Sequence, residues 1–243
     1  MAKPPRRQRR FWAALVLLPV ALAILVSLGT WQVKRLHWKE DLLASIEQRR
    51  HAEPLDVAGV EAELQAGRPV DYRAASASGT FLHDKERHFF ATFEGQSGYY
   101  LYTPLQLADG RFLFVNRGFV PYDRKEASTR PESLVAGAQR ITGLARARLA
   151  EKPSSLVPDN DEAGNIFYWK DLDRMAASAG LPEGQVLPFF LDADATPVPG
   201  GLPRGGVTVI DLPNSHLQYA ITWYGLALAL AGVSVFAWVR RKS

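Results

Sequence analysis

Residues Phe11–Leu28 read FWAALVLLPVALAILVSL, a stretch of 18 residues without a charge. A second uncharged stretch, Tyr219–Val239, reads YAITWYGLALALAGVSVFAWV and has 21 residues. As α-helices the two stretches would be about 27 and 31 Å long, close to the roughly 30 Å hydrocarbon core of a bilayer. The sequence therefore predicts two transmembrane helices, one near each end of the chain.

Each apolar stretch has an alternative interpretation. The first has the basic start and apolar core of a cleaved signal peptide, but it is longer than the usual core of such a peptide. At its end the sequence SLGTWQ (residues 27–32) offers bulky residues where a signal peptidase prefers small ones. The second stretch could be the buried helix of a soluble domain, but its length and the basic cluster that ends it favour a membrane span.

Basic residues flank both stretches on the side of the chain ends, and no acidic residue accompanies them. They are Lys3, Arg6, Arg7, Arg9 and Arg10 before the first stretch, and Arg240, Arg241 and Lys242 after the second. Since cytoplasmic flanks carry an excess of Lys and Arg, we expect residues 1–10 and 240–243 to be cytoplasmic. Residues 29–218 then form an extracytoplasmic domain, which tolerates Lys34, Arg35 and Lys39 beside the span because long domains translocate largely regardless of charge.

The overall composition limits the functional classes. The net charge of +4 comes mainly from the two chain ends, while acidic and basic residues are mixed through the middle, so we expect no nucleic-acid partner. The chain has no cysteine, which excludes disulfides and thiolate metal sites. Ten residues before the first span are too few for a mitochondrial presequence, so we expect the bacterial inner membrane.

The middle of the chain has the pattern of a β-rich domain. The helical spacing of the first span continues to about Arg50, and Asp56–Gly67 is typical of one short helix. Asp109-Gly110 separates two β-rich runs and predicts a hairpin in which both residues tolerate positive φ. A second helix is predicted at Asn165–Ala179. The strands are expected at residues 70–81, 88–93, 99–121, 139–149, 186–191 and 206–212. The predicted fold is an α+β membrane protein whose mainly antiparallel domain is barrel-like or sandwich-like.

No enzyme signature is present: the chain lacks a phosphate-binding glycine loop, a G-x-S-x-G elbow and an H-E-x-x-H motif. The acidic residues are scattered, and the five histidines lack the spacing of metal ligands. We interpret His83 and His88 as solvated or edge-strand residues. No catalytic residue and no metal site is therefore predicted from these patterns.

His216 differs from the other histidines by its place, about one turn before the second span. On a helix it shares a face with Trp223, and Trp31 and Arg35 lie at the corresponding level of the first helix. An imidazole, aromatic rings and a cation at the membrane boundary would suit a haem, with His216 as axial ligand and Arg35 as partner of a propionate. The alternative is an aromatic belt with a histidine that caps the helix start. We also expect the two spans to pack together through Gly225 and Gly232.

Five segments, taken in order, span nearly the whole chain. They are LGTWQVKRLHWKEDLL (28–43), GTF (79–81), TPLQLADGRFLFVNRGFVP (103–121), NIFYWKDLDRMA (165–176) and PNSHLQYAITWYGLAL (213–228). Together they resemble the Surfeit locus protein 1 family, although Phe119 stands where the family more often has tryptophan. Their order between two terminal spans makes the resemblance specific.

The resemblance implies an assembly factor, not an enzyme, that assists the delivery or insertion of haem a into subunit I of cytochrome c oxidase. It implies transient binding of haem a, with His216 at the motif position of the iron ligand. Subunit I is the implied partner, with haem a synthase and other oxidase assembly factors as further candidates. Two alternatives stay open: a cofactor-free chaperone that holds apo-subunit I, and a membrane-tethered periplasmic enzyme.

Overall fold

The computed structural model describes the backbone of residues 6–208 and 213–240, with side chains from Leu15 onward within those ranges. The chain divides into two compact units. One comprises Met1–Ser45 with Asp211–Ser243, and the other comprises Ile46–Ile210. We call the first the helical unit and the second the central domain.

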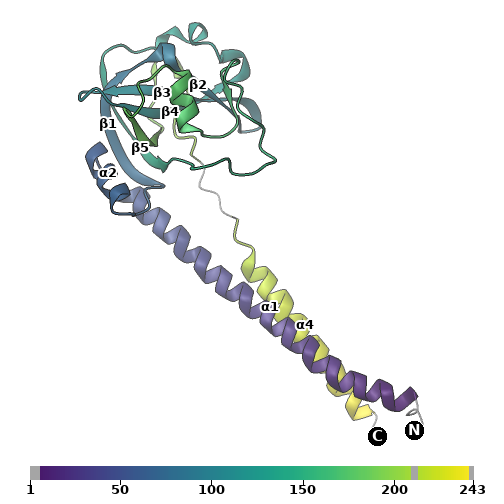
Figure 1. Cartoon of the computed structure of the whole chain (residues 1–243). Helices are drawn as coiled ribbons and strands as arrows, with labels where there is room; N and C mark the ends of the chain where they lie inside the picture. Colours follow the sequence, from purple (N-terminus) through teal and green to yellow (C-terminus); the bar gives the residue numbers. More distant parts are fainter. Residues whose placement is uncertain (1–5, 209–212, 241–243) are drawn as a thin grey trace. The chain divides into compact units, whose positions relative to one another are not determined.

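The first unit is built from two long helices. Helix α1 spans Arg6–His51 and helix α4 spans His216–Arg240 (Figure 1). Both are long and apolar enough to cross a membrane. With 46 residues, α1 is about 69 Å long, more than twice the hydrocarbon thickness. The predicted continuation of the first helix beyond its apolar stretch is confirmed, and its last turns belong to the central domain.

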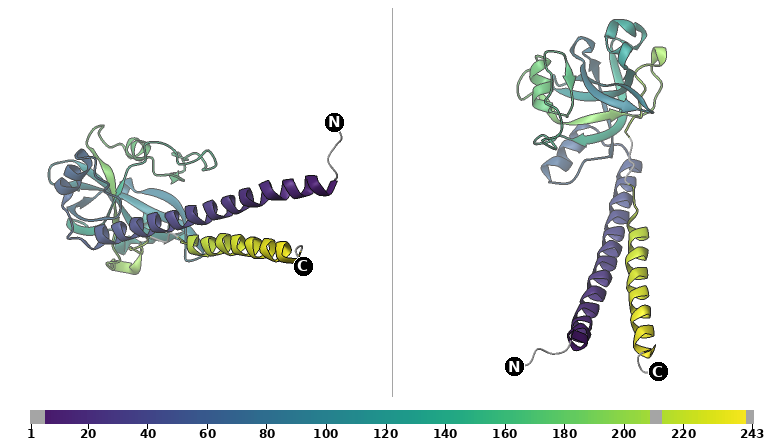
Figure 2. Two further views of the ribbon diagram at one scale, coloured as in Figure 1. Left: turned by 90° about the horizontal axis from the view of Figure 1, so that it is seen from below. Right: turned by 90° about the vertical axis from the view of Figure 1, so that its right-hand side faces the viewer.

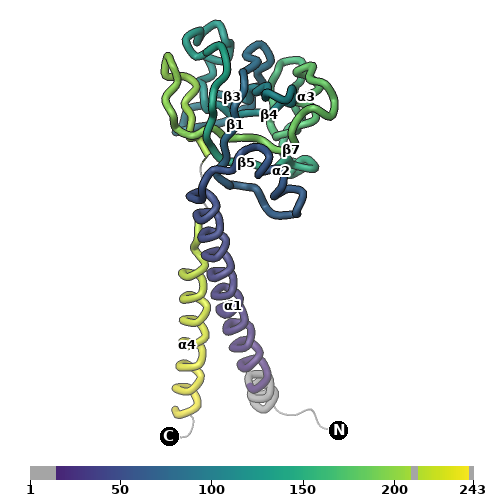
Figure 3. The backbone as a smooth tube through the Cα atoms, turned by 90° about the vertical axis from the view of Figure 1, so that its left-hand side faces the viewer, coloured from purple at the N-terminus to yellow at the C-terminus, as the bar shows by residue number. Residues whose placement is uncertain are grey.

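Helices α1 and α4 lie side by side (Figures 2 and 3), and small residues allow their close approach. Gly29 is buried on α1, where an added Cβ would lie 2.9 Å from the ring of Tyr224. The Tyr224 hydroxyl lies 3.0 Å from the hydroxyl of Thr30. On α4, Ala220 and Ala227 are buried. They are seven residues apart, so they form one stripe of the helix.

The prediction that Gly225 and Gly232 form this contact is wrong. A Cβ added at either glycine would have no atom within 4 Å. Gly225 follows Ala220 by five residues, which places it about 140° away around the helix. Residues seven positions apart do form one stripe of α4, as predicted. The stripe that is buried, however, contains Ala220 and Ala227 and not the two glycines.

The central domain is a seven-stranded sheet in which five strands close into a barrel. The strands are β1 (Arg73–Phe81), β2 (Arg87–Phe93), β3 (Gln96–Leu107), β4 (Phe112–Pro121), β5 (Ala138–Ala147), β6 (Ile166–Phe167) and β7 (Val186–Ala193). The order is β1-β5-β7-β4-β3-β2-β6, and a further pairing of β1 with β3 closes the ring. All pairings are antiparallel except β4–β7 and β2–β6.

A five-stranded Greek-key barrel of this order has the connectivity of the oligonucleotide- and oligosaccharide-binding fold. The predicted mainly antiparallel barrel is confirmed, and the alternative of a sandwich is wrong. The barrel interior is filled by aliphatic and aromatic side chains that include Leu105, Leu113, Val115 and Leu191. Helix α2 (Val57–Gln65) packs Val60 against this core. A barrel fold by itself indicates no function.

The β3–β4 hairpin is present, but its turn differs from the predicted one. Only Gly110 has a positive φ, of 85°, while Asp109 does not. The Gly110 amide donates to the Leu107 carbonyl at 3.0 Å, and the Leu107 amide donates to Arg111 at 2.9 Å. This is a turn over Ala108 and Asp109 followed by a glycine bulge, the usual three-residue hairpin loop. The positive φ that favours glycine is therefore at Gly110, one position after the two central residues of the turn, Ala108 and Asp109.

The helix predicted at Asn165–Ala179 begins later than expected. Asn165 has a φ of 49°, and Ile166–Phe167 form strand β6 beside β2. Helix α3 spans Leu172–Ser178, and its N-cap Asp171 accepts a hydrogen bond from the Arg174 amide. Ile166 and Phe167 form a strand because pairing with β2 overrides the helical spacing there. Of the strand predicted at residues 206–212, residues 206–208 are not a strand and the rest lie outside the described residues.

Candidate functional site

His216 is the first residue of α4, and its ring is held by a side chain of α1. Its Nδ1 lies 2.7 Å from Oε1 of Gln32, which is only 9% exposed. A carbonyl oxygen accepts a hydrogen bond and cannot donate one, so Nδ1 carries the proton in this pair. In a neutral imidazole the other nitrogen, Nε2, then keeps its lone pair. A neutral imidazole in this form is ready to coordinate a metal ion through Nε2.

Two further contacts fix the position of the start of α4 against α1. The Lys39 ammonium donates to the carbonyl of Pro213, just before α4. The hydroxyl groups of Thr30 and Tyr224 form a hydrogen bond about two turns further along α4 than His216. These contacts lie on both sides of the histidine along the helix axis, so α4 is joined to α1 at other points besides His216.

The other predicted site residues lie around this pair without bonding to it. Trp31 is 56% exposed, and Arg35 is exposed with its guanidinium 3.7 Å from the ring centre of Trp38. Trp223 is partly buried on α4. Among the described residues, none of Trp31, Arg35 and Trp223 donates a hydrogen bond to His216. The structure therefore places them on the same two helices as the histidine.

Their heights follow from helix geometry. Arg35 is three residues beyond the histidine's α1 partner, Gln32, about 4.5 Å along the axis and on a neighbouring stripe. Trp31 and Arg35 share that stripe at a four-residue spacing, with Trp38 three residues further on. Trp223 lies about 10 Å from His216 along α4. The two helices thus present aromatic rings and a cation next to the imidazole.

Gln32 is the residue that the sequence analysis missed. It follows Gly29 by three residues, so both face the same neighbour on one side of α1. A polar amide at that spacing from an interfacial glycine was the signal that could have found it, because buried polar groups need a partner. The sequence analysis considered only aromatic and charged residues at this level.

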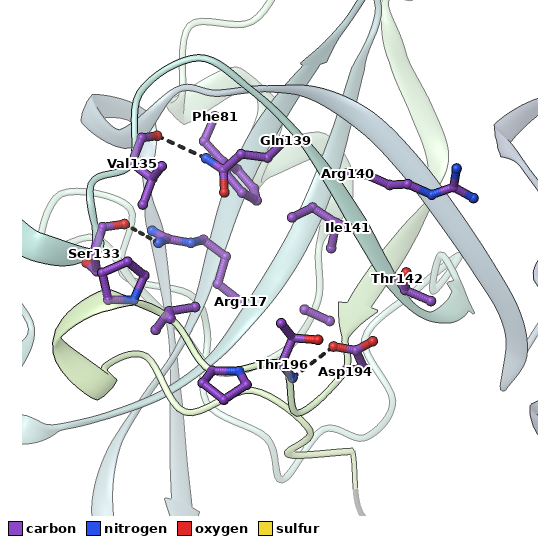
Figure 4. A pocket seen from close by; sticks show the side chains of 14 residues that line it. Phe81, Arg117, Ser133, Val135, Gln139, Arg140, Ile141, Thr142, Asp194 and Thr196 are labelled. Atoms are coloured by element: carbon purple, nitrogen blue, oxygen red, sulfur yellow. Dashed lines mark hydrogen bonds between the residues drawn. The ribbon is translucent and has the colours of Figure 1, made fainter.

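The central domain contains a separate cavity of about 180 Å³ (Figure 4). Phe81, Ile141 and three residues of the 197–199 segment line it, together with Arg117. The Arg117 guanidinium already donates to Glu86 Oε1 at 3.1 Å and to the Ser133 carbonyl at 2.6 Å. Arg117 is therefore already paired with a carboxylate and a backbone carbonyl within the fold.

The carboxylate that pairs with Arg117 belongs to a buried triad. Glu86 also accepts from Arg130, and all three side chains are less than 7% exposed. Arg130 further donates to backbone carbonyls of residues 124 and 125. The triad ties the 122–135 segment to β2 and β4. Breaking such a pair leaves a buried charge unpaired, which is strongly destabilising, so its role is structural.

A second buried carboxylate, Asp192 on β7, is also fully engaged. It accepts from Asn116 at 3.1 Å, from Thr208 at 2.8 Å and from Arg146 at 3.4 Å. These three donors hold the Asp192 side chain within the fold.

The two histidines interpreted as solvated are more enclosed than expected. His83 donates through Nε2 to the Val135 carbonyl at 3.1 Å and accepts from Arg117 at Nδ1. Burial lowers its pKa. His88 lies near the sheet edge as predicted, but it is only 6% exposed, and neither ring nitrogen has a hydrogen-bond partner. Burial lowers the pKa of His88 to about 4.

Among the described residues, no group of three or more histidine, aspartate or glutamate side chains could hold a metal ion. Among the described residues, His216 is therefore not part of such a group. A macrocycle that fills the remaining equatorial positions itself, such as haem, suits a single imidazole.

These features define a class: a chain with two long apolar terminal helices that pack together and flank a closed β-barrel, with an imidazole where the second helix begins. The chain matches the model of the SURF1 family over residues 20–228. It therefore belongs to the SURF1 family.

Relatives from animals and a unicellular eukaryote agree with this assignment. The chain is 37% identical over 233 residues to Surfeit locus protein 1 from Homo sapiens, covering 88% of this chain and 73% of the relative. It is 36% identical over 230 residues to the protein of the same name from Rattus norvegicus, covering 88% and 72%. It is 36% identical over 246 residues to a SURF1-like protein from Monosiga brevicollis, covering 96% and 88%.

Proposed function

We propose that this protein is an assembly factor for haem–copper cytochrome c oxidase that binds haem a transiently and assists its insertion into subunit I. Membership of the SURF1 family supports the assembly role. The observation that carries the haem role is the hydrogen bond from His216 Nδ1 to Gln32, because it leaves Nε2 free to bind iron.

The donor set fits a haem. The His216 imidazole is a common axial ligand of haem iron. Arg35 presents a planar guanidinium that matches a propionate carboxylate. Trp31 and Trp223 supply aromatic surface for the macrocycle from the two helices. When bound, haem supplies a redox-active iron, and the chain's own residues would orient it and hold its charged edge at the membrane boundary.

A single imidazole suits a carrier. One protein ligand gives a weaker hold than two, and a protein that delivers its cofactor must release it. The exposure of Trp31 and Arg35 means that the macrocycle would be covered on one side only. The open side would then be available to subunit I, the acceptor that we propose. Haem a synthase is the corresponding donor, and other oxidase assembly factors would bind the same complex.

The location follows from the candidate spans and the charges beside them. We propose the bacterial inner membrane, with both termini in the cytoplasm and the barrel in the periplasm. In that arrangement His216 lies at the periplasmic boundary of the hydrocarbon. A haem bound there would keep its apolar skirt toward lipid and its propionates toward water.

The decisive experiment is the absorption spectrum of the full-length protein purified from a host that makes haem a. We expect bound haem a in the wild type and at least a tenfold lower haem content in His216→Ala, with unchanged protein in the membrane. His37→Ala is the matched control, since His37 is an exposed histidine on α1, and it should keep its haem.

Each other result has a distinct meaning. Full haem occupancy in His216→Ala would overturn the ligand role. A wild-type protein without haem that still co-purifies with subunit I would instead identify a cofactor-free chaperone. Activity of the full-length protein on a substrate, in the absence of haem and of subunit I, would favour the membrane-tethered enzyme.

A further inference from the structure

We propose that Gln32 is a positioning residue for the iron ligand: its amide oxygen holds His216 in the tautomer whose Nε2 is unprotonated. This inference rests on the proposed haem-binding function. It assigns a role to a residue that neither carries charge nor lies on the aromatic stripe.

The hydrogen bond has the properties of an outer-shell contact to a metal ligand. It is 2.7 Å long and joins the imidazole nitrogen that would face away from the iron. Metal-binding histidines usually donate their second ring nitrogen to an oxygen, which fixes the tautomer and raises the basicity of the ligating nitrogen. A carboxamide oxygen on the neighbouring helix can do both.

The burial of Gln32 makes this role specific. Gln32 is 9% exposed, in a part of α1 where its neighbour Trp31 on the adjacent stripe is 56% exposed. A buried amide that loses its partner costs free energy, so the imidazole and the amide hold each other in place. Without the acceptor, the proton of a neutral imidazole is free to sit on Nε2, where it competes with iron for the lone pair.

A role of Gln32 in helix packing can be separated from a role in tautomer selection. The helices are joined at a second polar point by Thr30 and Tyr224. Tyr224→Phe removes that contact without touching His216 or Gln32. It is therefore the control for a general loosening of the α1–α4 interface.

Two Gln32 variants differ in one property. Gln32→Met keeps an unbranched side chain of similar length but has no hydrogen-bond acceptor. Gln32→Glu keeps an acceptor oxygen at the same distance along the side chain. If the hydrogen-bond acceptor matters, Gln32→Glu should keep the His216 tautomer and the haem affinity of the wild type, whereas Gln32→Met should lose both.

The first measurement uses the haem-free, full-length protein in detergent with ¹⁵N-labelled histidine. The ring nitrogen shifts of His216, identified by their loss in His216→Ala, should show a protonated Nδ1 and an unprotonated Nε2 in the wild type. Gln32→Met should move the population toward Nε2–H, whereas Gln32→Glu and Tyr224→Phe should not. A wild-type His216 already protonated at Nε2 would overturn the inference.

The second measurement is titration of the same proteins with ferric haem b as the probe. We expect Gln32→Met to weaken binding by about 10–100-fold, the usual loss for an outer-shell partner. Gln32→Glu should stay within a few-fold of the wild type. Equal weakening by Gln32→Met and Tyr224→Phe would show that Gln32 acts through helix packing, and it would overturn the inference.

The proposed function and this inference fail in different ways. If His216→Ala binds haem as tightly as the wild type, the ligand role itself is wrong, whatever the Gln32 variants do. If His216→Ala loses haem while Gln32→Met keeps both the wild-type tautomer and the wild-type affinity, only the role of Gln32 is wrong.

Discussion

Gly29 of α1 lies against the ring of Tyr224 of α4, so close that a Cβ on Gly29 would be 2.9 Å from a ring carbon. No real Cβ tolerates that distance to a rigid aromatic ring without movement. The glycine therefore sets how near the two helices can come. The Gln32–His216 hydrogen bond is three residues away on α1, so it depends on this close approach.

We expect Gly29→Leu to separate α1 from α4. Small residues at membrane helix contacts allow the packing that joins the helices, and a large side chain here would displace the Tyr224 ring. The measurement is cross-linking between cysteines introduced at Leu28 and Tyr219, in a chain without native cysteine. The cross-linked fraction should fall several-fold.

Gly225→Leu is the matched control for this change. It adds the same side chain at a glycine with no atom within 4 Å of a new Cβ. Its cross-linked fraction should equal that of the parent protein. If both variants behave alike, the helix contact does not pass through Gly29.

The barrel hairpin gives a prediction about backbone conformation. Gly110 has a φ of 85° and no neighbour within 4 Å of a new Cβ, so a substitution there meets conformational strain and no clash. Gly110→Val should lower the free energy of unfolding by about 1–2 kcal/mol, because a branched residue resists the left-handed region. Denaturant unfolding of the full-length protein in detergent measures it.

Gly110→Asn separates strain from other causes. Asparagine enters the left-handed region more readily than valine, so its effect should be clearly smaller. Equal destabilisation by valine and asparagine would contradict the strain argument for this turn.

The orientation of the two candidate spans is testable by fusion. We expect a reporter that is active only in the periplasm to be active after Gly67, beyond the end of α2, and inactive after residue 243. A reporter that is active only in the cytoplasm should give the opposite pair of results. The same result at both positions would rule out a chain with both termini on the cytoplasmic side.

The local signals in the sequence predicted most of the elements. Length and uniform apolarity identify α1 and α4, and alternation with a glycine turn identifies the β3–β4 hairpin. Each of these features depends on residues that are close together in the sequence. The closure of the barrel could not be predicted from the sequence, because the pairing of β1 with β3 joins segments that no local pattern connects.

The candidate site divides in the same way. His216 was predicted from its place beside an apolar stretch, which is a local property. Its partner Gln32 is 184 positions away in the sequence, and the contact depends on how two helices are rotated against each other. The same rotation places Gly225 away from α1. Side-chain pairs between distant helices require the packed structure.

His88 gives the last prediction, on the pH dependence of stability. Its ring is buried without a hydrogen-bond partner, and burial lowers its pKa from 6.5 to about 4 in the folded protein. Between these values the unfolded chain binds a proton that the folded chain does not. The stability is therefore greatest above pH 6.5 and falls as the pH decreases toward 4, by about 3 kcal/mol from this residue.

We expect His88→Phe to remove most of this loss. Phenylalanine cannot titrate, and its ring can keep the edge contact with Tyr99, whose centre lies 5.8 Å from that of His88. The free energy of unfolding, measured from pH 7.5 to 4.5 in detergent, should vary less in the variant than in the wild type. Because an unpartnered polar ring is costly to bury, the variant should be at least as stable at pH 7.5. An unchanged acid dependence would mean that His88 is not the buried group that titrates between the folded and unfolded states.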